Sequence, residues 1–285
     1  MKSFIKIFLK WLIIFIVLFF FLNFLIGASY DDSNLTFLFM GVDASNVKEA
    51  KGVRSDTIML INVDKNKDLI SIISIPRDTR TPIEGRKYEE KINHAYAYGG
   101  PTLTTKTVSN LLGINIDYYA VVDYDLVSQF IDLIGGVEIY VPIDMKYQDP
   151  VANPPLYIDL QEGLQVLDGD KALQYLRFRK GYANADLGRI DAQQEFLKVL
   201  INETLSLKNI PKIPSMIKLY KTNVDTNIPV SMALRYGLST MIPGPLEIES
   251  HVLPGSPKMI NGISYYIHDK QETQRLIQQV IYSDK

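Results

Sequence analysis

The amino-acid sequence predicts a layered α/β domain with a covered β-sheet, preceded by one N-terminal transmembrane helix. Apolar runs rich in β-branched residues alternate with segments of helical periodicity from residue 35 to the C-terminus, a pattern typical of layered α/β domains. The continuous apolar character of the first three runs indicates buried strands. A separate run from Trp11 to Ala28 is long and apolar enough to cross a membrane.

The composition supports a globular protein and excludes several kinds of site. Of the 285 residues, 47% are hydrophobic and 22% are charged, which is enough apolar material for a substantial core. The chain has no cysteine, so disulfides, thiol catalysis and thiolate metal sites are excluded. Because the chain has 3 histidines, we do not expect a zinc site built from several of them.

The N-terminal apolar run predicts a membrane anchor. From Trp11 to Ala28 the one strongly polar residue is Asn23, and at about 1.5 Å rise per residue the run spans roughly 27 Å, close to the thickness of the hydrocarbon core. A cleavable signal peptide is the alternative, because residues 27–29 are small. The run is longer than the apolar part of a signal peptide, about 7–15 residues, so we favour an uncleaved anchor.

Charges on either side of this run predict its orientation. Three lysines precede it and two aspartates follow it, so residues 1–10 are expected in the cytoplasm, residues 11–29 in the membrane and residues 30–285 outside the cell. The three lysines carry +3 of a formal net charge of −2, which leaves the extracytoplasmic domain near −5. An acidic domain is a poor candidate for binding nucleic acid.

The first part of the extracytoplasmic domain is predicted to be rich in strands. Residues 35–41, 57–63 and 69–75 form the three apolar runs, and a helix is expected over 103–113, ending at Gly113. A strand over 117–122, a helix over 124–134 and a strand over 137–141 follow. Gly135 and Gly136 are expected to stop the helix before the last of these strands.

The second part alternates in the same way. Helices are expected near 169–177, 187–205, 231–241 and 270–282, with strands near 246–253 and 263–267. Residues 143–166 and 206–230 contain prolines and are less periodic, but neither segment has the composition of a linker between domains. We therefore expect a single extracytoplasmic domain.

An arginine-rich stretch lies between the helices near 169–177 and 187–205. Asp168 is the expected N-cap of the first helix, and Arg177 and Arg179 point the same way if the chain is extended after it. Arg189 and Gln193 lie four residues apart on one face of the next helix. Three guanidinium groups and an amide can then converge between two helix ends, although arginines covering apolar neighbours at the surface are a common alternative.

Further polar side chains stand at the ends of the predicted strands. Asp43 follows the first strand, Asp56 begins the second, and Arg77 follows the third, with Lys91 soon after. Ligands of open α/β sheets gather where such strand ends meet. Two carboxylates suit Mg²⁺, and arginine forks match phosphate oxygens. The sequence therefore predicts a metal-bound pyrophosphate site, with salt-bridged turns as the alternative for each cluster.

Eight short motifs carry a resemblance to a known family. They are "FMGVD", "RSDTIML", "SIPRDT", "KINHAYAYGG", "DYYAVVD", "DLIGGVEIYVP", "LDGDKALQYLRFR" and "DLGRIDAQQ", in this order. Together they resemble the LytR–CpsA–Psr family over residues 36–205. The resemblance implies a three-layer α/β/α domain with a central mixed β-sheet, held outside the cell membrane of a Gram-positive type of bacterium by a single anchor.

The resemblance also implies an activity. Members of the family bind polyprenyl-pyrophosphate-linked glycans and transfer the glycan with its phosphate to peptidoglycan, which releases polyprenyl phosphate. By motif, Asp43 and Asp56 would hold Mg²⁺ (or Mn²⁺) and act in catalysis together with Arg77. The pyrophosphate would be bound by Arg77, Lys91, Arg177, Arg179, Arg189 and Gln193. One departure is that "GVDASN" lacks an arginine often found soon after this aspartate.

The chemistry of phosphoanhydride cleavage agrees with this set of residues. The reaction depends mainly on positioning and on neutralising charge at phosphoryl and leaving oxygens, and the acceptor hydroxyl needs a weak base, for which Asp43, Asp56 and Asp191 are candidates. A lipid tail needs an apolar tunnel, and residues 118–139 contain enough apolar side chains to line one or, alternatively, to form plain core. Wall teichoic acid, capsule and other wall polymers would all present the same pyrophosphate.

Two other functions compete with glycopolymer transfer. A binding or regulatory protein of cell-wall metabolism would capture the lipid-linked glycan without turnover. A pyrophosphohydrolase would use water as the acceptor and release free phosphorylated glycan. A P-loop enzyme is excluded because the chain lacks the G-x-x-x-x-G-K-[ST] motif, and no nucleophile elbow supports a serine triad.

Overall fold

The centre of the molecule is a six-stranded sheet with the strand order β11-β6-β1-β2-β3-β12. Its strands are β1 (Asn34–Val42), β2 (Ser55–Asp64), β3 (Leu69–Ser74), β6 (Tyr118–Asp123), β11 (Asp225–Thr226) and β12 (Glu247–Val252). The pairs β1/β2, β2/β3 and β6/β11 are antiparallel, whereas β1/β6 and β3/β12 are parallel. The sheet is therefore mixed, as predicted.

This computed structural model describes residues 34–43, 47, 52–151, 155–178, 186–241 and 246–282, and of residues 186–189, 240 and 241 it describes the backbone alone. The predicted cytoplasmic segment 1–10 and the predicted anchor 11–29 lie outside the described residues. Within those described ranges, no helix has both the length and the apolar character needed to cross a membrane.

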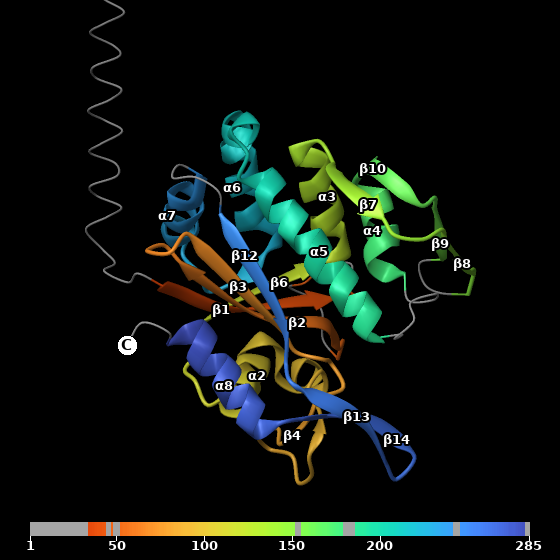
Figure 1. The fold of residues 1–285 in the computed structure, drawn as a ribbon, viewed down its shortest axis with the longest axis vertical. Coiled ribbons are helices and arrows are strands. Elements are labelled where there is room, and N and C mark those ends of the chain that lie inside the picture. The colour runs from red at the N-terminus through yellow and green to blue at the C-terminus, as the bar shows by residue number, and fades with distance from the viewer. Residues whose placement is uncertain are drawn as a thin grey trace, which may run out of the picture.

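Helices cover both faces of the sheet, which confirms the layered α/β prediction (Figure 1). They are α2 (His94–Leu112), α3 (Tyr124–Ile134), α4 (Gly169–Arg177), α5 (Asp186–Thr204), α6 (Ile213–Asn223), α7 (Val230–Met241) and α8 (Lys270–Ile281). In Figure 1, α2 and α8 lie below the sheet, and α3, α5, α6 and α7 lie above it.

The alternation of side chains along β1 explains the two helical layers. Leu38 and Met40 point to one face and are buried in a core that α2 and α8 complete. Phe37 and Phe39 point to the opposite face, where they pack against a second core that includes residues of α5 and α7. Because successive side chains of a strand point to opposite faces, a strand apolar at every position needs a helical layer on each side.

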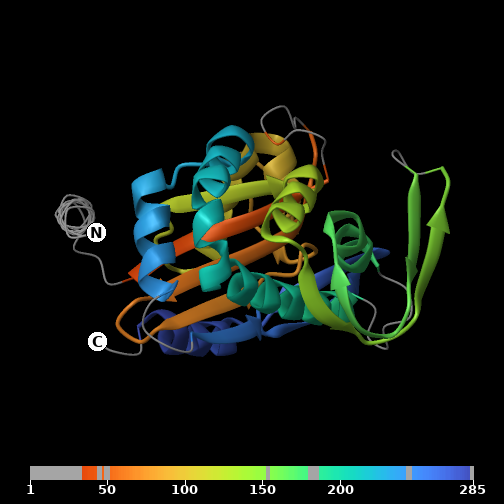
Figure 2. The same cartoon turned by 90° about the horizontal axis from the view of Figure 1, so that it is seen from above.

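Four two-stranded ribbons surround the central sheet. They pair β4 (Arg80–Thr81) with β5 (Glu90–Lys91), β7 (Val137–Val141) with β10 (Gly163–Leu167), β8 (Met145–Asp149) with β9 (Leu156–Leu160), and β13 (Gly255–Ile260) with β14 (Ile263–His268). Figure 2 shows that β8 and β9 extend away from the sheet, at the end of the molecule opposite the start of β1.

Two segments are more regular than their sequences indicated. Residues 143–166 contain β8, β9 and most of β10, short strands that alternate more and less exposed positions and so lack the continuous apolar runs that mark the central strands. Residues 206–230 form a 3₁₀ helix, η2 (Leu207–Lys212), then α6 and β11. Helix α2 also begins earlier than expected, at His94, with a break at Gly99 and Gly100.

Glycines end two helices as predicted. Gly113 after α2 has φ 70°, and its N–H donates to the carbonyl oxygen of Ser109. Gly135 after α3 has φ 97° and donates to carbonyl oxygens in the last turn. Left-handed backbone at these positions favours glycine, and the chain can then reverse into the next strand.

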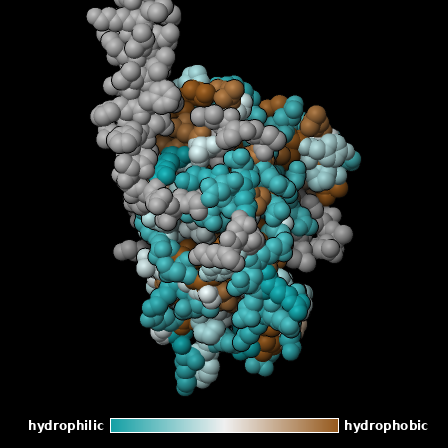
Figure 3. Space-filling model, turned by 60° about the vertical axis from the view of Figure 1, so that its left-hand side comes forward, coloured by the Kyte–Doolittle hydropathy of each residue, from teal (hydrophilic) through white to brown (hydrophobic). Residues whose placement is uncertain are grey.

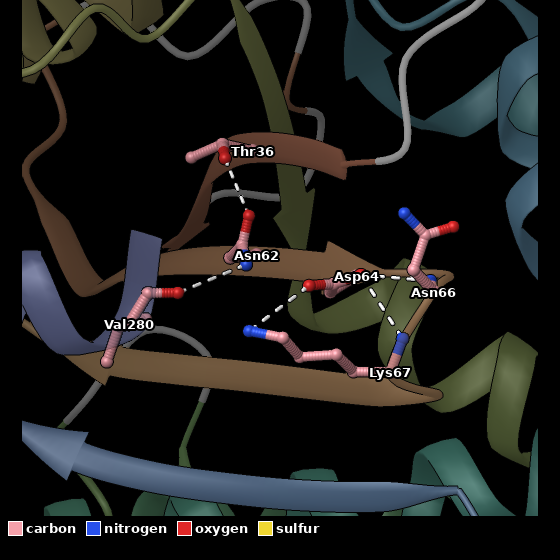
Figure 4. Close-up of polar contacts among 6 residues, drawn as sticks. All are labelled: Thr36, Asn62, Asp64, Asn66, Lys67 and Val280. Carbon is pink, nitrogen blue, oxygen red and sulfur yellow. Dashed lines mark hydrogen bonds and ion pairs between the residues drawn. The ribbon is translucent and has the colours of Figure 1, made fainter. Parts of the chain in front are cut away.

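A polar contact fixes the C-terminal helix to the sheet (Figure 4). Asn62 of β2 is 3% exposed. Its side-chain oxygen accepts a 2.8 Å hydrogen bond from Thr36 Oγ1, and its amide nitrogen lies 3.4 Å from the Val280 carbonyl oxygen of α8. At the end of β2, Asp64 accepts from the backbone N–H groups of Asn66 and Lys67 and so closes the turn into β3. The region beyond residue 205 thus completes the same domain.

Candidate active site

A polar cleft of about 480 Å³ lies where β1 ends, β2 begins and β3 ends. Its lining residues are Asp43, Gly52, Val53, Arg54, Asp56, Arg77, Asp78, Lys91 and Asn93. Because β1 and β2 are antiparallel neighbours, the end of one and the start of the other meet at the same edge of the sheet. The strand-end clusters predicted from the sequence therefore come together here.

The floor of the cleft is an ion pair. Arg77, which follows β3, donates through Nη1 to the Asp56 carboxylate on β2. Both side chains are about one-fifth exposed, at 23% and 22%, so the pair is partly shielded from water and can be reached by a ligand. Charge-assisted pairs of this kind hold a guanidinium in a defined orientation.

Lys91 reaches the same cleft from the small β4–β5 ribbon. Its ammonium group lies 2.9 Å from Asp78 Oδ1. The ribbon is tied to the loop after β3, because the backbone N–H of Ile92 donates to the Thr79 carbonyl oxygen at 2.8 Å. Next to it, the side-chain oxygen of Asn93 is buried and accepts no hydrogen bond from any described residue. A buried polar group of this kind is available to a ligand.

Glu90 holds the chain on either side of Lys91. Its carboxylate lies 2.9 Å from His94 Nδ1, accepts from the Tyr98 hydroxyl at 2.7 Å, and accepts from Arg86 Nε at 2.8 Å. These hydrogen bonds from His94, Tyr98 and Arg86 lower the pKa of Glu90 to about 2. The carboxylate is therefore ionised at neutral pH and fixes the turn that presents Lys91.

Arg177 closes the opposite side of the cleft. It is the last residue of α4, and its Nη2 lies 3.9 Å from Asp43 Oδ2. Its guanidinium also stacks 5.1 Å from the centre of the Tyr124 ring. Asp168 caps α4 by accepting from the Lys171 N–H, as predicted, and Phe178 turns inward and is buried. The predicted approach of Arg177 to the cleft is thus observed.

The remaining members of the predicted arginine cluster are only partly placed. Arg179 lies outside the described residues. Arg189 lies on α5 one turn before Gln193, but its side chain is outside the description. Gln193 lines an apolar cavity that adjoins the cleft rather than the cleft itself. The convergence of Arg179 and Arg189 on this site stays a prediction.

Three further lining residues stand in the strand-end motifs "RSDTIML", "SIPRDT" and "KINHAYAYGG", but the sequence assigned them no binding role. Arg54, Asp78 and Asn93 all belong to the cleft. Arg54 is exposed just before β2 and adds a guanidinium to the cleft, in a chain that lacks the arginine often found after "GVD". The charged residues Arg54 and Asp56 on either side of Ser55 mark this strand start in the sequence, but they do not tell which cation binds a ligand.

The carboxylates of the cleft fit a magnesium ion bound together with phosphate. Asp43 and Asp56 both line the cleft, whereas no cluster of three or more metal-binding side chains occurs in the described part of the chain. Mg²⁺ is usually held by one or two carboxylates, with water and phosphate oxygens completing its shell. Each carboxylate also faces a guanidinium, so a metal here would share them with Arg77 and Arg177.

An apolar cavity begins behind the cleft, above the sheet. Its part next to the cleft is lined by Gly41, Thr57, Tyr124 and Gln193. A larger part, of about 390 Å³, continues between the sheet and α3, α5, α6 and α7. Phe39 borders both parts, and so do Val122, Val127, Leu197 and Leu200.

The outer surface agrees with this arrangement. Figure 3 shows a mostly hydrophilic face on which hydrophobic surface gathers toward the end of the molecule that carries α6. Leu207 and Ile210 of η2, which leads into α6, are among the exposed large hydrophobic side chains. The apolar cavity thus approaches an apolar part of the surface at one end and the polar cleft at the other.

Comparison with known proteins decides the family. The model of the LytR_cpsA_psr family matches residues 25–281. The chain belongs to the LytR–CpsA–Psr family. This confirms the resemblance drawn from the eight motifs and extends it beyond residue 205.

Relatives in this family share both sequence and fold with the chain. TagV of Bacillus subtilis (strain 168), a polyisoprenyl-teichoic acid–peptidoglycan teichoic acid transferase, is 37% identical over 199 residues, which cover 69% of this chain and 50% of TagV. The chain thus matches about half the length of TagV. The crystal structure of B. subtilis TagV has a TM-score of 0.74 at 31% identity and covers 88% of this chain and 98% of that structure.

Two further relatives carry related names. TagU of Bacillus subtilis (strain 168), with the same transferase name, is 32% identical over 234 residues, which cover 82% of this chain and 72% of TagU. A structure of TagT bound to LIIa-WTA has a TM-score of 0.71 at 29% identity and covers 88% of this chain and 92% of that structure. The mixed sheet with helices on both faces is therefore the fold of this family.

Proposed function

We propose that the protein is a membrane-anchored phosphotransferase that moves a phospho-glycopolymer from a polyprenyl-pyrophosphate carrier to peptidoglycan. The observation that carries this proposal is the continuity between two unlike spaces, a polar cleft rich in cations and an apolar cavity that begins at its edge. A carrier with a charged head and a long apolar tail needs both. The transferase names of TagV and TagU, and the ligand of the TagT structure, support the same reaction class.

Basic side chains of the cleft would bind the pyrophosphate. Arg54, Arg77 and Lys91 line the cleft, and Arg177 approaches it at Asp43. Guanidinium groups bind phosphate oxygens through pairs of parallel hydrogen bonds, and Arg77 and Arg177 are already oriented by Asp56 and Tyr124. Arg179, Arg189 and Gln193 would add to this set.

The polyprenyl tail would enter the apolar cavity. Gly41 lies at the junction with the cleft, and a Cβ atom there would come within 3.1 Å of Thr57 Cβ. Glycine at this position therefore keeps the junction open. Beyond it the walls are apolar, formed in part by Val122, Leu126 and Phe130 from the segment 118–139 that the sequence indicated.

The reaction is a displacement at the phosphorus that carries the glycan. An acceptor hydroxyl of peptidoglycan forms the new P–O bond, the phosphoanhydride bond breaks, and polyprenyl phosphate leaves with the bonding electron pair. Asp43 is half exposed and its guanidinium partner lies as far as 3.9 Å away, whereas Asp56 accepts a direct hydrogen bond from Arg77, so Asp43 is better placed to take the hydroxyl proton. Asp191 lines neither space. Mg²⁺ (or Mn²⁺), when held by Asp43 and Asp56, would supply charge neutralisation at the phosphoryl oxygens.

The proposal includes a location at the cell membrane. We expect a single-pass protein with its N-terminus in the cytoplasm and its catalytic domain outside, because the charge pattern around residues 11–29 favours that orientation. Protease added to intact protoplasts should digest the domain. Protection of the domain would contradict the orientation, and a mature N-terminus near Tyr30 would contradict the anchor.

The test of the reaction is a transfer assay with the full chain. A lipid-linked saccharide labelled in the glycan is incubated with peptidoglycan and Mg²⁺, and the label is followed. We expect covalent label on peptidoglycan, its loss on chelation and its return with Mg²⁺ or Mn²⁺. Release of free phosphorylated glycan would instead indicate a pyrophosphohydrolase, and binding without turnover would indicate a regulatory protein of cell-wall metabolism.

A further inference from the structure

A second polar cavity, of about 720 Å³, lies below the sheet and outside the site described so far. Its walls come from the C-terminal half of α2, the first turns of α8 and the loop between β4 and β5. Figure 1 shows α2, α8 and β4 side by side at this end of the molecule. Its floor is partly apolar, with Ile83, Leu111 and Leu112.

The β4–β5 ribbon separates this cavity from the phosphate cleft. Arg80 of β4 lies opposite Lys91 of β5 in the ladder. Lys91 lines the phosphate cleft, whereas Arg80 lines the second cavity. Both cations rest on the ring of Tyr265 in β14, with Arg80 Cζ 5.6 Å and Lys91 Nζ 5.9 Å from its centre. The β4–β5 ribbon therefore borders both spaces.

The chemistry of the second cavity differs from that of the cleft. Its two carboxylates are neutralised, Glu84 by Lys106 at 2.5 Å and Glu89 by Arg80 at 3.3 Å. Lys270 on α8 is exposed, and none of the ion pairs between described residues includes it. Its charge is therefore available to a ligand.

Two amides complete the open polar groups. Asn110 on α2 and Gln274 on α8 line the cavity, and neither side chain makes a hydrogen bond to another described residue. Amide groups pair with amides and hydroxyls, and an ammonium group pairs with a carboxylate. The lining carries four cations against two paired glutamates, so it favours an anionic ligand. A ligand that carries both amide bonds and a free carboxylate uses the ammonium group and the two amides together, whereas a pyrophosphate would use the cations alone.

We propose that this cavity docks a stem peptide of the peptidoglycan acceptor, with a peptide carboxylate on Lys270 and peptide amides on Asn110 and Gln274. The inference rests on the proposed function. Peptidoglycan consists of glycan strands substituted by short peptides, so a peptide held here leaves its glycan strand crossing the β4–β5 ribbon. The acceptor hydroxyl is then presented to the phosphate cleft on the other side of Lys91.

The experiment compares Lys270→Gln and the triple variant Lys270→Gln/Asn110→Ala/Gln274→Ala with Arg275→Gln. Arg275 is a matched control because it lies on the same helix, is 64% exposed and does not line the cavity. Full-length proteins are assayed with two soluble, uncrosslinked glycan strands, one with its stem peptides and one stripped of them. Binding of each strand is also measured by calorimetry without any lipid-linked donor.

We expect weaker binding of the peptide-bearing strand, by about 2- to 5-fold in Lys270→Gln because exposed charge pairs are weak, and by about tenfold or more in the triple variant. Its acceptor KM should rise in parallel, while the donor KM, the melting temperature and binding of the stripped strand stay unchanged. Equal effects on both strands, or an effect in Arg275→Gln as large as in Lys270→Gln, would overturn the inference. Because binding is read without donor, a failure of transfer alone would contradict the proposed function and leave this result standing.

Discussion

The two faces of the central sheet are built from the same strands and differ in how they are covered. Below the sheet, Leu38, Met40 and Leu60 pack with α2 and α8 into a closed core in which each of them is at most 1% exposed. Above the sheet, the half-buried Phe39 and its neighbours border an apolar cavity under α5, α6 and α7. One face is filled by the protein itself, and the other leaves room for an apolar ligand.

This difference separates stability from function along a single strand. Even-numbered side chains of β1 stabilise the fold, because they are buried in close contact with helices. On the opposite face, the Phe39 side chain and the backbone of Gly41 line the space that we assign to the lipid tail. Substitutions one residue apart should therefore produce different kinds of effect.

The largest expected effect is on the closed face. Leu38→Ala should lower the free energy of unfolding by about 2–5 kcal/mol, because it removes a fully buried side chain and leaves a cavity. Urea unfolding of the full chain measures this change. Phe39→Ala should cost less stability because it already borders open space. An equal loss in both variants would show that the upper cavity is filled in solution and would contradict the comparison.

The next effect falls at the polar end of the open face. Arg177→Lys should reduce transfer by about 10- to 150-fold, because lysine cannot reproduce bidentate hydrogen bonds worth roughly 1.5–3 kcal/mol to a charged phosphate. The melting temperature should change little, but its rise on adding pyrophosphate-lipid should shrink. Arg275→Lys on the exposed face of α8 serves as the control.

If Arg177 is instead a surface arginine that covers apolar neighbours, the pattern reverses. Arg177→Lys would then lower stability through lost packing and would leave the response to the lipid unchanged. That outcome would remove Arg177 from the pyrophosphate site and would leave its 3.9 Å approach to Asp43 as a structural contact.

A smaller effect is expected from filling the apolar cavity. Leu200 borders both of its parts, and Leu200→Trp should raise the KM for a long-chain polyprenyl donor by about tenfold, since excluding two methylene groups costs about 0.8 kcal/mol each. A donor with a short lipid should be unaffected. Leu207→Trp, at an exposed position of η2, adds the same ring outside the cavity and is the control. If Leu200→Trp changed the KM for the long-chain donor and for the short-lipid donor by the same factor relative to the wild type, this cavity would be excluded as the site of the tail.

The sequence could predict the closed face and the polar cleft for physical reasons. Continuous apolar runs require cover on both faces of a strand, and polar residues directly after such runs must lie at the edge of the sheet. Asp43, Asp56 and Arg77 therefore meet as expected. Asp168 was identifiable as an N-cap because aspartate is favoured directly before a helix, where its side chain accepts from a backbone N–H group, here that of Lys171.

The sequence could not predict the cavity or the outer ribbons. Val122 and Phe130 have the same composition whether they fill a core or line a hollow, so only the placement of α6 and α7 decides between the two. Helix α6 carries apolar residues at helical spacing, Met216, Ile217 and Tyr220, but Pro211 and Pro214 just before them hid the helix in the sequence. Lys270, Asn110 and Gln274 lie far apart in the chain, and no local pattern brings them to one cavity.

The smallest expected effect lies at the border between the closed face and the cleft, where Glu90 joins the β4–β5 ribbon to α2. Hydrogen bonds from His94, Tyr98 and Arg86 lower the pKa of Glu90 to about 2. A carboxylate with a lowered pKa in the folded state contributes stability that is fully present above its ordinary pKa of about 4.5 and is lost as the pH falls toward 2. The wild type should therefore lose stability across this window, and Glu90→Gln should lose less of it. At pH 7 the variant should be less stable by about 1 kcal/mol or less, because Arg86 and Tyr98 are nearly half exposed.

Urea unfolding at a series of pH values measures both effects. The matched control is Glu272→Gln, which removes an exposed carboxylate paired with Arg275 on α8. Parallel pH profiles for the wild type and Glu90→Gln would show that Glu90 does not hold the turn before Lys91, and the ribbon would then need another support.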